Sequence, residues 1–184
     1  MAVKNNRRTL VTKRILKESL LQLMEEKPIS KISIKEICEI SEMSRSTFYL
    51  HYQDQFELLK DIENEVLEKS FEALKDVGSD FNTIESIEAF LNYVKSNKET
   101  FGVLFCQADT EDFQNAIIKK VEAHVMESIP DIEQTPHDRY IFTFIMQGSM
   151  SVLRSWIKTD FDMPLPELAN LIFNCCHNIN TTAM

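Results

Sequence analysis

Apolar residues recur along most of the chain at the spacing of amphipathic helices. Within residues 9–26, Leu16, Leu20 and Leu23 follow the positions i, i+4 and i+7, which places them on one side of a helix. Pro28 disfavours helical geometry at the residue before it, so this first helix ends there. The pattern has the period of a helix and lacks the strict alternation of a strand.

The same spacing, together with start and stop signals, continues to the end of the chain. Further helices are predicted over 33–41, from 44 to about 50, and over 54–76, 83–97, 99–106, 111–128, 137–158 and 166–179. The chain has only 3 Gly and 5 Pro among 184 residues, too few for a hairpin-rich fold. We therefore expect an all-α fold of about nine helices with short connections.

The second and third predicted helices have well-marked starts. Ser33 and Glu36 have the spacing of a capping box, and Ile32 and Ile37 occupy the hydrophobic-staple positions around it. A few residues later, Ser44 provides a side-chain cap for the third helix. Two short helices joined by a tight turn, after a longer first helix, are the outline of a helix-turn-helix.

Charge is distributed unevenly between this N-terminal part and the rest. The net charge is −9, yet residues 1–52 hold ten Lys or Arg against six Glu, which gives +4, and the remainder carries −13. A phosphate backbone is attracted to the basic part and repelled by the acidic one. The asymmetry indicates a small nucleic-acid-binding module joined to an acidic body.

Helical spacing divides the third helix into two sides. Phe48 and Tyr52 are apolar enough to dock onto the first two helices, whereas Arg45, Ser46 and Tyr49 fall on an outward side. A recognition helix needs such a division, because small or hydrogen-bonding side chains must reach base edges in the major groove. On these residues alone, an ordinary solvated three-helix corner remains an alternative.

The segment from Ile34 to Leu59 contains a distinctive motif. Thr47 to Tyr52 read T-x-Y-x-H-[FY], and an acidic-aliphatic E-L-L helix start follows at Glu57. This segment closely resembles the TetR/AcrR family of bacterial transcriptional regulators. Residues 144–171 resemble, more loosely, the last two helices of family members, which form their dimer interface.

The resemblance implies a fold, a function and a set of contacts. It implies a DNA-binding domain over 1–53 and a helical effector-binding and dimerisation domain over 54–184. It implies a homodimer that binds double-stranded DNA at an inverted-repeat operator, acts as a repressor and is released by a small-molecule effector. The implied base-reading residues are Lys35, Arg45, Ser46 and Tyr49, and the implied backbone contacts are Ser33, Thr47, His51 and Tyr52.

Two positions depart from the family pattern. Glu42 stands in the turn where family members usually have glycine, so a carboxylate must tolerate a tight turn close to the DNA. Gln55 stands where the family often has lysine, which removes one expected phosphate contact. Neither change removes the outward side of the third helix.

The C-terminal part offers a dimer surface and a candidate pocket. The predicted helix 137–158 is apolar nearly all round, so one part of it must face another chain. The predicted interface residues are Phe144, Gly148, Leu153, Trp156 and Leu171. An effector pocket is predicted at Phe101, Phe105, Phe142 and Met146, and the acidic body favours an apolar or cationic effector over an anionic one.

Other classes of protein fit less well. The sequence has no G-x-S-x-G, H-E-x-x-H, P-loop or dinucleotide-binding motif, so we expect neither an enzyme nor a cofactor or metal site. No apolar run approaches the length of a membrane span, and we expect a cytoplasmic protein. A helical protein–protein interaction module, a regulator without a small-molecule effector, and a redox sensor remain alternatives. The redox sensor would use Cys106 or the vicinal pair of Cys175 and Cys176.

Overall fold

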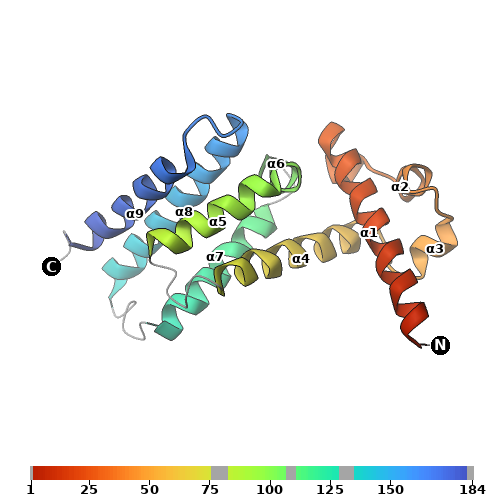
Figure 1. Cartoon of the computed structure of the whole chain (residues 1–184), viewed down its shortest axis with the longest axis horizontal. Coiled ribbons are helices and arrows are strands. Elements are labelled where there is room, and N and C mark those ends of the chain that lie inside the picture. Colours follow the sequence, from red (N-terminus) through yellow and green to blue (C-terminus); the bar gives the residue numbers. More distant parts are fainter. Residues whose placement is uncertain (1, 76–82, 107–110, 129–134, 182–184) are drawn as a thin grey trace. The chain divides into compact units, whose positions relative to one another are not determined.

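The chain is built from helices throughout the part that the structure describes (Figure 1). This computed structural model describes residues 2–75, 83–106, 111–128 and 135–181. The α-helices are α1 (Ala2–Glu26), α2 (Ile34–Ile40), α3 (Arg45–Tyr49), α4 (Gln55–Lys75), α5 (Ile84–Ser96), α6 (Lys98–Cys106), α7 (Glu111–Ser128), α8 (Pro136–Lys158) and α9 (Leu165–Thr181). A short 3-10 helix, η1 (Ile29–Lys31), follows α1. These described segments contain no strand, and the expected all-α fold is confirmed.

Most helices begin and end close to where the sequence predicts, and the exceptions lie near the N-terminus. Helix α1 begins at Ala2, earlier than the start near Thr9 that the sequence predicts. No Gly or Pro precedes Pro28, and the Lys and Arg residues of this stretch are good helix formers, so nothing stops the helix earlier. The 3-10 turn η1 was not predicted, because three residues are too few to show a period.

The start of α2 is fixed by the predicted capping box. The Ser33 hydroxyl accepts a hydrogen bond from Glu36 N at 3.3 Å, and Ser33 N donates to Glu36 Oε2 at 2.9 Å. Lys27 Nζ lies 2.5 Å from Glu36 Oε1, and hydrogen bonds from Lys27 and Ser33 lower the pKa of Glu36 to about 2. Ile32 and Ile37 are both buried, as the staple requires.

The chain forms two compact units, the first ending at Val66 and the second beginning at Leu67. In the first unit α2 packs against both α1 and α3. Its core includes the buried residues Leu16, Leu20, Met24, Ile29, Ile37, Phe48 and Leu58. This unit extends past residue 53 to include the first half of α4, and the functional boundary at 53/54 stays a prediction.

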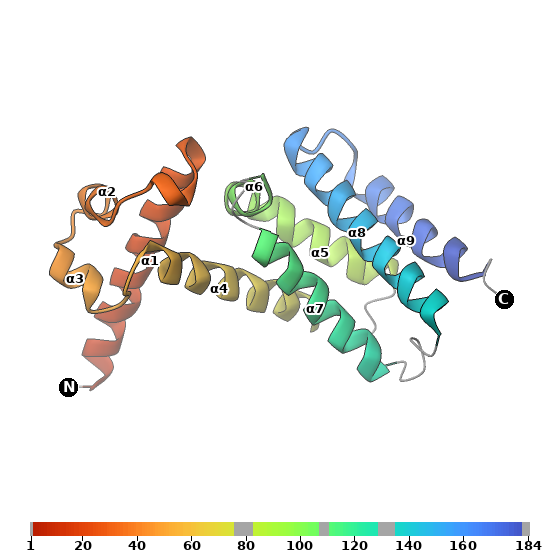
Figure 2. The same ribbon diagram turned by 180° about the vertical axis from the view of Figure 1, so that it is seen from behind.

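The second unit is a bundle of helices with an aromatic core. Helix α5 runs along α9, and α8 packs on α6 and α9 (Figure 2). The rings of Phe101, Phe105 and Phe113 lie 5.7 to 6.2 Å apart, and all three are buried. Within the described segments, no helix is both long and apolar enough to cross a bilayer.

Candidate nucleic-acid interface

The turn between α2 and α3 is a Schellman motif with an unusual residue at its left-handed position. Met43 N donates to Cys38 O at 3.0 Å, and Glu42 N donates to Glu39 O at 3.4 Å, which are the two hydrogen bonds of that motif. Glu42 has φ 53°, a conformation that favours glycine and that costs other residues roughly 1–2 kcal/mol. The turn that the resemblance implied is therefore formed, with glutamate in place of glycine at its left-handed position.

Helix α3 is held at its N-terminus by a cluster of hydroxyl groups. Ser44 is the N-cap, and its Oγ accepts a hydrogen bond from Thr47 N at 3.1 Å. The same oxygen lies 2.7 Å from Ser46 Oγ and 2.9 Å from Thr47 Oγ1. These contacts fix the first turn of a helix that has only five residues.

The two sides of α3 differ in burial as the sequence predicts. Phe48 is completely buried, and its ring packs edge-on against Tyr49, with centroids 5.7 Å apart. Arg45 and Ser46 are exposed, and 57% of Tyr49 is exposed. Arg45 forms no ion pair with any residue that the structure describes. The outward side therefore presents a guanidinium, a hydroxyl and a phenol to solvent.

The remaining predicted contact residues differ in exposure and in the partners that they already have. The Lys35 side chain is 65% exposed and lies 3.5 Å from Glu39, an exposed pair that water screens. Ser33 is exposed, but its hydroxyl donates to Glu36 at 2.8 Å. Thr47 and His51 are half-buried. Lys35 is thus accessible, whereas Ser33 is already engaged in capping α2.

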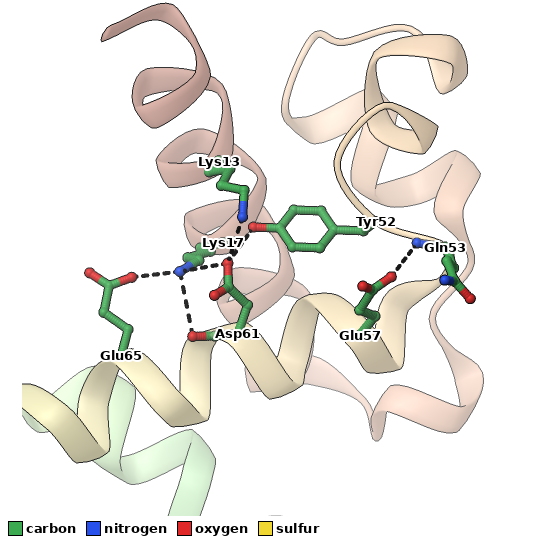
Figure 3. Close-up of polar contacts among 7 residues, drawn as sticks. All are labelled: Lys13, Lys17, Tyr52, Gln53, Glu57, Asp61 and Glu65. Carbon is green, nitrogen blue, oxygen red and sulfur yellow. Dashed lines mark hydrogen bonds and ion pairs between the residues drawn. The ribbon is translucent and has the colours of Figure 1, made fainter. Parts of the chain in front are cut away.

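Tyr52 lies in the interior of the first unit, where its hydroxyl is part of an ion cluster (Figure 3). It is 3% exposed and donates to Asp61 Oδ2 at 2.7 Å. Lys17 Nζ lies 3.0 Å from the same carboxylate oxygen and 2.6 Å from Glu65, and Lys13 Nζ lies 3.4 Å from Asp61. The cluster joins α1, α4 and the residue three positions after α3.

The protonation states of this cluster favour its hydrogen bonds. Burial raises the pKa of Asp61, but hydrogen bonds from Tyr52 and Lys17 and the charges of both lysines outweigh it and hold the pKa below its ordinary value. Burial and the hydrogen bond to Asp61 raise the pKa of Tyr52. Asp61 is therefore a carboxylate acceptor and Tyr52 a neutral donor at neutral pH.

The position of Tyr52 corrects one expectation. A backbone phosphate contact was predicted for it, but a side chain that is 3% exposed and bonded to Asp61 is not available to a phosphate. Tyr52 anchors α3, the alternative role that its apolar ring also suggested. The ion cluster itself was missed, although Lys13/Lys17 and Asp61/Glu65 each share one helix face at the i, i+4 spacing.

Comparison with known proteins identifies the family of the chain through its C-terminal region. A family model for the C-terminal region of transcriptional regulators of the TetR type matches residues 82–178. The chain belongs to the TetR family of transcriptional regulators.

Two curated relatives of this TetR-family chain are helix-turn-helix regulators. The chain is 24% identical over 155 residues to the uncharacterised HTH-type transcriptional regulator YxbF of Bacillus subtilis, covering 79% of this chain and 39% of YxbF. It is 26% identical over 102 residues to DhaS of Lactococcus lactis, an HTH-type transcriptional activator of the dhaKLM operon, covering 55% of this chain and 52% of DhaS. The matches thus span about 39% and 52% of the relatives' length.

Solved structures share the fold of the TetR-family chain. A TetR transcriptional regulator from Streptococcus agalactiae 2603V superposes with a TM-score of 0.74 at 21% identity, covering 96% of this chain and 99% of that one. The dihydroxyacetone kinase operon activator DhaS gives a TM-score of 0.61 at 20% identity, covering 94% and 98%.

The predicted dimer residues of the TetR-family chain fall into two groups. Phe144 is 69% exposed, Leu171 is 44% exposed, and Gly148 faces open space. Leu153 and Trp156 are buried, and Trp156 Nε1 donates to Met163 O at 2.8 Å within its own chain. The assignment of Leu153 and Trp156 to an interface is therefore a correction, because both side chains belong to the core of their own unit.

The second unit of the TetR-family chain contains a cavity that is partly open to solvent. Its volume is about 130 Å³, and its lining is apolar except for two serines. The lining residues are Phe71, Ser86, Ile87, Phe90, Leu91, Ile117, Val121, Ser149, Met150, Leu153 and Ile172. None of the predicted pocket residues lines it. Phe101 and Phe105 pack in the aromatic core, Met146 is buried and Phe142 is half-buried.

The cysteines of the described segments differ in burial and in the pKa of their thiols. No three His, Cys, Asp or Glu side chains among the described residues gather as metal ligands would. Burial raises the pKa of the thiols of Cys38 and Cys176, which lowers the thiolate fraction that a redox sensor needs. Cys175 is exposed, and the Cys106 side chain lies outside the described residues.

The ion cluster predicts a pH-dependent contribution to stability. Replacing Asp61 by Asn should lower the free energy of unfolding by about 1–2 kcal/mol at pH 7, after allowance for the solvent exposure of Asp61. Because its folded pKa is depressed, the contribution of Asp61 is complete above the unfolded pKa of about 4 and is lost as the pH falls through the folded value. Urea unfolding between pH 7 and 3 measures the difference.

Tyr52→Phe is the matched control for Asp61→Asn. It removes one donor but leaves the carboxylate with both lysines, so a smaller loss of about 1 kcal/mol is expected. A gap between wild type and Asp61→Asn that stayed constant down to pH 3 would contradict the assigned role.

Proposed function

We propose that the chain is a sequence-specific DNA-binding regulator that inserts α3 into the major groove and binds an inverted-repeat operator as a homodimer. The observation that carries the proposal is the division of α3. Phe48 is completely buried, while Arg45, Ser46 and Tyr49 face solvent. Groups of these kinds read base edges when a helix lies in the groove.

The basic charge of the first unit favours DNA as the partner, although some of its lysines are already paired with carboxylates. Lys13 and Lys17 are engaged with Asp61, and Lys27 is engaged with Glu36. Arg45 has no such partner among the described residues, so its guanidinium is available for the O6 and N7 atoms of guanine. The proposal therefore assigns the main base contact to Arg45, with Lys35, Ser46 and Tyr49 beside it.

The backbone contacts belong to the same proposal, in a reduced set. Thr47 and His51 are half-buried next to the exposed side of α3, and Ser33 lies at the N-terminus of α2. Helix N-termini attract phosphate through their amide groups. We propose Thr47 and His51 as phosphate contacts, with the helix N-terminus at Ser33 as a third, and Tyr52 is not among them.

Exposed apolar residues of α8 and α9 support the homodimer. Tyr140 and Phe144 lie one helical turn apart on α8, each 69% exposed, and Leu171 on α9 is 44% exposed. Gly148 follows Phe144 after one further turn and leaves room for another helix. A twofold contact through Phe144, Gly148 and Leu171 would cover this apolar surface and supply a second copy of α3.

We propose repression as the direction of regulation, because a dimer bound over an operator obstructs other proteins on the same DNA. DhaS, one of the relatives, is named an activator, so the position of the operator relative to the promoter decides the direction. The proposal places the protein in the cytoplasm, where such DNA lies.

The cavity supports a small-molecule effector and narrows its chemistry. Its lining carries no charged side chain, so the acidic charge of the body gives a cation no partner inside it. An engineered apolar cavity of about 150 Å³ binds benzene, and the volume here is about 130 Å³. We propose a small, uncharged, apolar effector, which replaces the wider expectation of an apolar or cationic one.

The rival proposal is a helical interaction module, and selection from a randomised pool of duplexes separates the two. A regulator should enrich an inverted repeat, and its affinity should fall steeply with salt. Arg45→Ala should then weaken binding by roughly 1–3 kcal/mol per half-site and relax the preference at one position of each half-site. An interaction module would enrich no sequence at all.

Arg14→Ala is the matched control for Arg45→Ala. Arg14 is equally charged and its side chain is 70% exposed on α1, outside the proposed contact set. Its removal should lower the affinity for all duplexes alike and leave the sequence preference unchanged.

The dimer surface predicts the effect of a charge at Phe144. Phe144→Glu should yield a folded monomer in light scattering at micromolar concentration, because the side chain is 69% exposed and its replacement does not disturb the core. Lys158→Glu alters the charge on the exposed end of the same helix and should remain a dimer. A dimer that survived Phe144→Glu would exclude this surface.

The cavity predicts binding of simple aromatic probes. Calorimetric titration with benzene or indole should show binding at one site per chain, and saturating probe should lower operator affinity. Ile87→Phe fills part of the cavity and should abolish the heat while leaving DNA binding in place, whereas Phe142→Leu should change neither. If Phe142→Leu abolished the heat of binding and Ile87→Phe did not, the result would favour the pocket predicted from sequence.

A further inference from the structure

We infer that Leu50 is an additional specificity-determining residue, whose side chain contacts the C5-methyl group of a thymine in each half-site. The inference rests on the proposed DNA-binding function and adds a contact that neither the motif nor the resemblance assigned. It concerns the residue directly after α3.

Leu50 is unusually exposed for a large apolar side chain. It is 80% exposed, above Tyr140 and Phe144 at 69% and Leu10 at 62%. Single exposed leucines are common on protein surfaces and by themselves require no explanation. The place of Leu50 relative to α3 is what gives its exposure a meaning.

The backbone places Leu50 on the outward side of α3. Leu50 N donates to Ser46 O at 3.2 Å, and φ −69° and ψ −19° continue the helical turn. Residues four apart lie on one face, and side chains lean toward the helix N-terminus, so Leu50 lies over the turn that carries Ser46, with Tyr49 adjacent. The outward side is thus extended by one apolar group.

The exposure of Leu50 follows from the burial of the residues two positions before and two positions after it. Phe48, two residues before, is completely buried, and Tyr52, two residues after, is anchored to Asp61 at 2.7 Å. Tyr52 N also donates to Phe48 O at 3.0 Å, which closes the turn around Leu50. With both flanking anchors inside the core, Leu50 has no inward position to adopt.

The chemistry of the side chain selects the type of base contact. Leucine has no hydrogen-bonding group, so neither a phosphate nor a base edge with only donors and acceptors can bind it specifically. The thymine methyl is the one apolar group that the four bases present in the major groove. A leucine on the reading side of α3 therefore favours thymine over the other bases at one position.

Uracil tests the contact, because deoxyuridine differs from thymidine only in the missing methyl group. The probe is the inverted repeat enriched by the wild-type full-length chain, resynthesised with thymines replaced one pair of symmetric positions at a time. At one pair, replacement should weaken wild-type binding roughly fourfold per half-site, the effect of one buried carbon. The two half-sites together should give roughly fifteenfold.

The variant Leu50→Ala should bind the thymine duplex with the same loss and should no longer distinguish thymine from uracil at that pair. Leu10→Ala removes another exposed leucine, and this variant should retain the full thymine–uracil difference. Circular dichroism and thermal unfolding of Leu50→Ala should match wild type, since the residue is 80% exposed.

Three other results would overturn the inference. An enriched repeat without a methyl-dependent thymine would exclude the contact while the proposed function stands. An equal loss on thymine and uracil duplexes in Leu50→Ala would assign Leu50 a general or structural role. Failure to enrich any sequence would remove this inference together with the proposed function.

Discussion

The orientation of α3 depends on two buried rings, because a helix of five residues has no stability of its own. Isolated helices of that length do not form in water, so tertiary contacts must supply the order. Phe48 provides it from within the helix, and Tyr52 provides it from just beyond, where its hydroxyl meets Asp61. The direction in which Arg45, Ser46, Tyr49 and Leu50 point follows from these two anchors.

In the first unit, the features that depend on local sequence were predictable, whereas contacts between distant parts of the chain were not. The caps at Ser33 and Ser44 are local, so their residues identify them without a fold, and both are formed. The contact between Lys17 and Asp61 joins residues 44 apart in the chain, and no local pattern pairs them. The sequence consequently allows Tyr52 two roles, and only the three-dimensional arrangement shows that its hydroxyl is buried against Asp61.

In the second unit, the sequence of α8 does not identify which of its apolar residues face the core. The sequence of α8 shows that part of it must be covered, but an all-round apolar pattern does not reveal which residues face inward. Leu153 and Trp156 turned out to be core, while Phe144 and Gly148 are exposed. The cavity was missed for a related reason, since its lining comes from five helices that only the fold brings together.

Glu42 has a consequence for how such a protein would search a chromosome. Its φ of 53° lies in the left-handed region that favours glycine, and its carboxylate lies in the turn just before α3. For a protein bound as proposed, this negative charge opposes every duplex about equally, whatever the sequence. It would shorten the time spent on wrong sites without altering the preference for the right one, so faster scanning would accompany weaker overall binding.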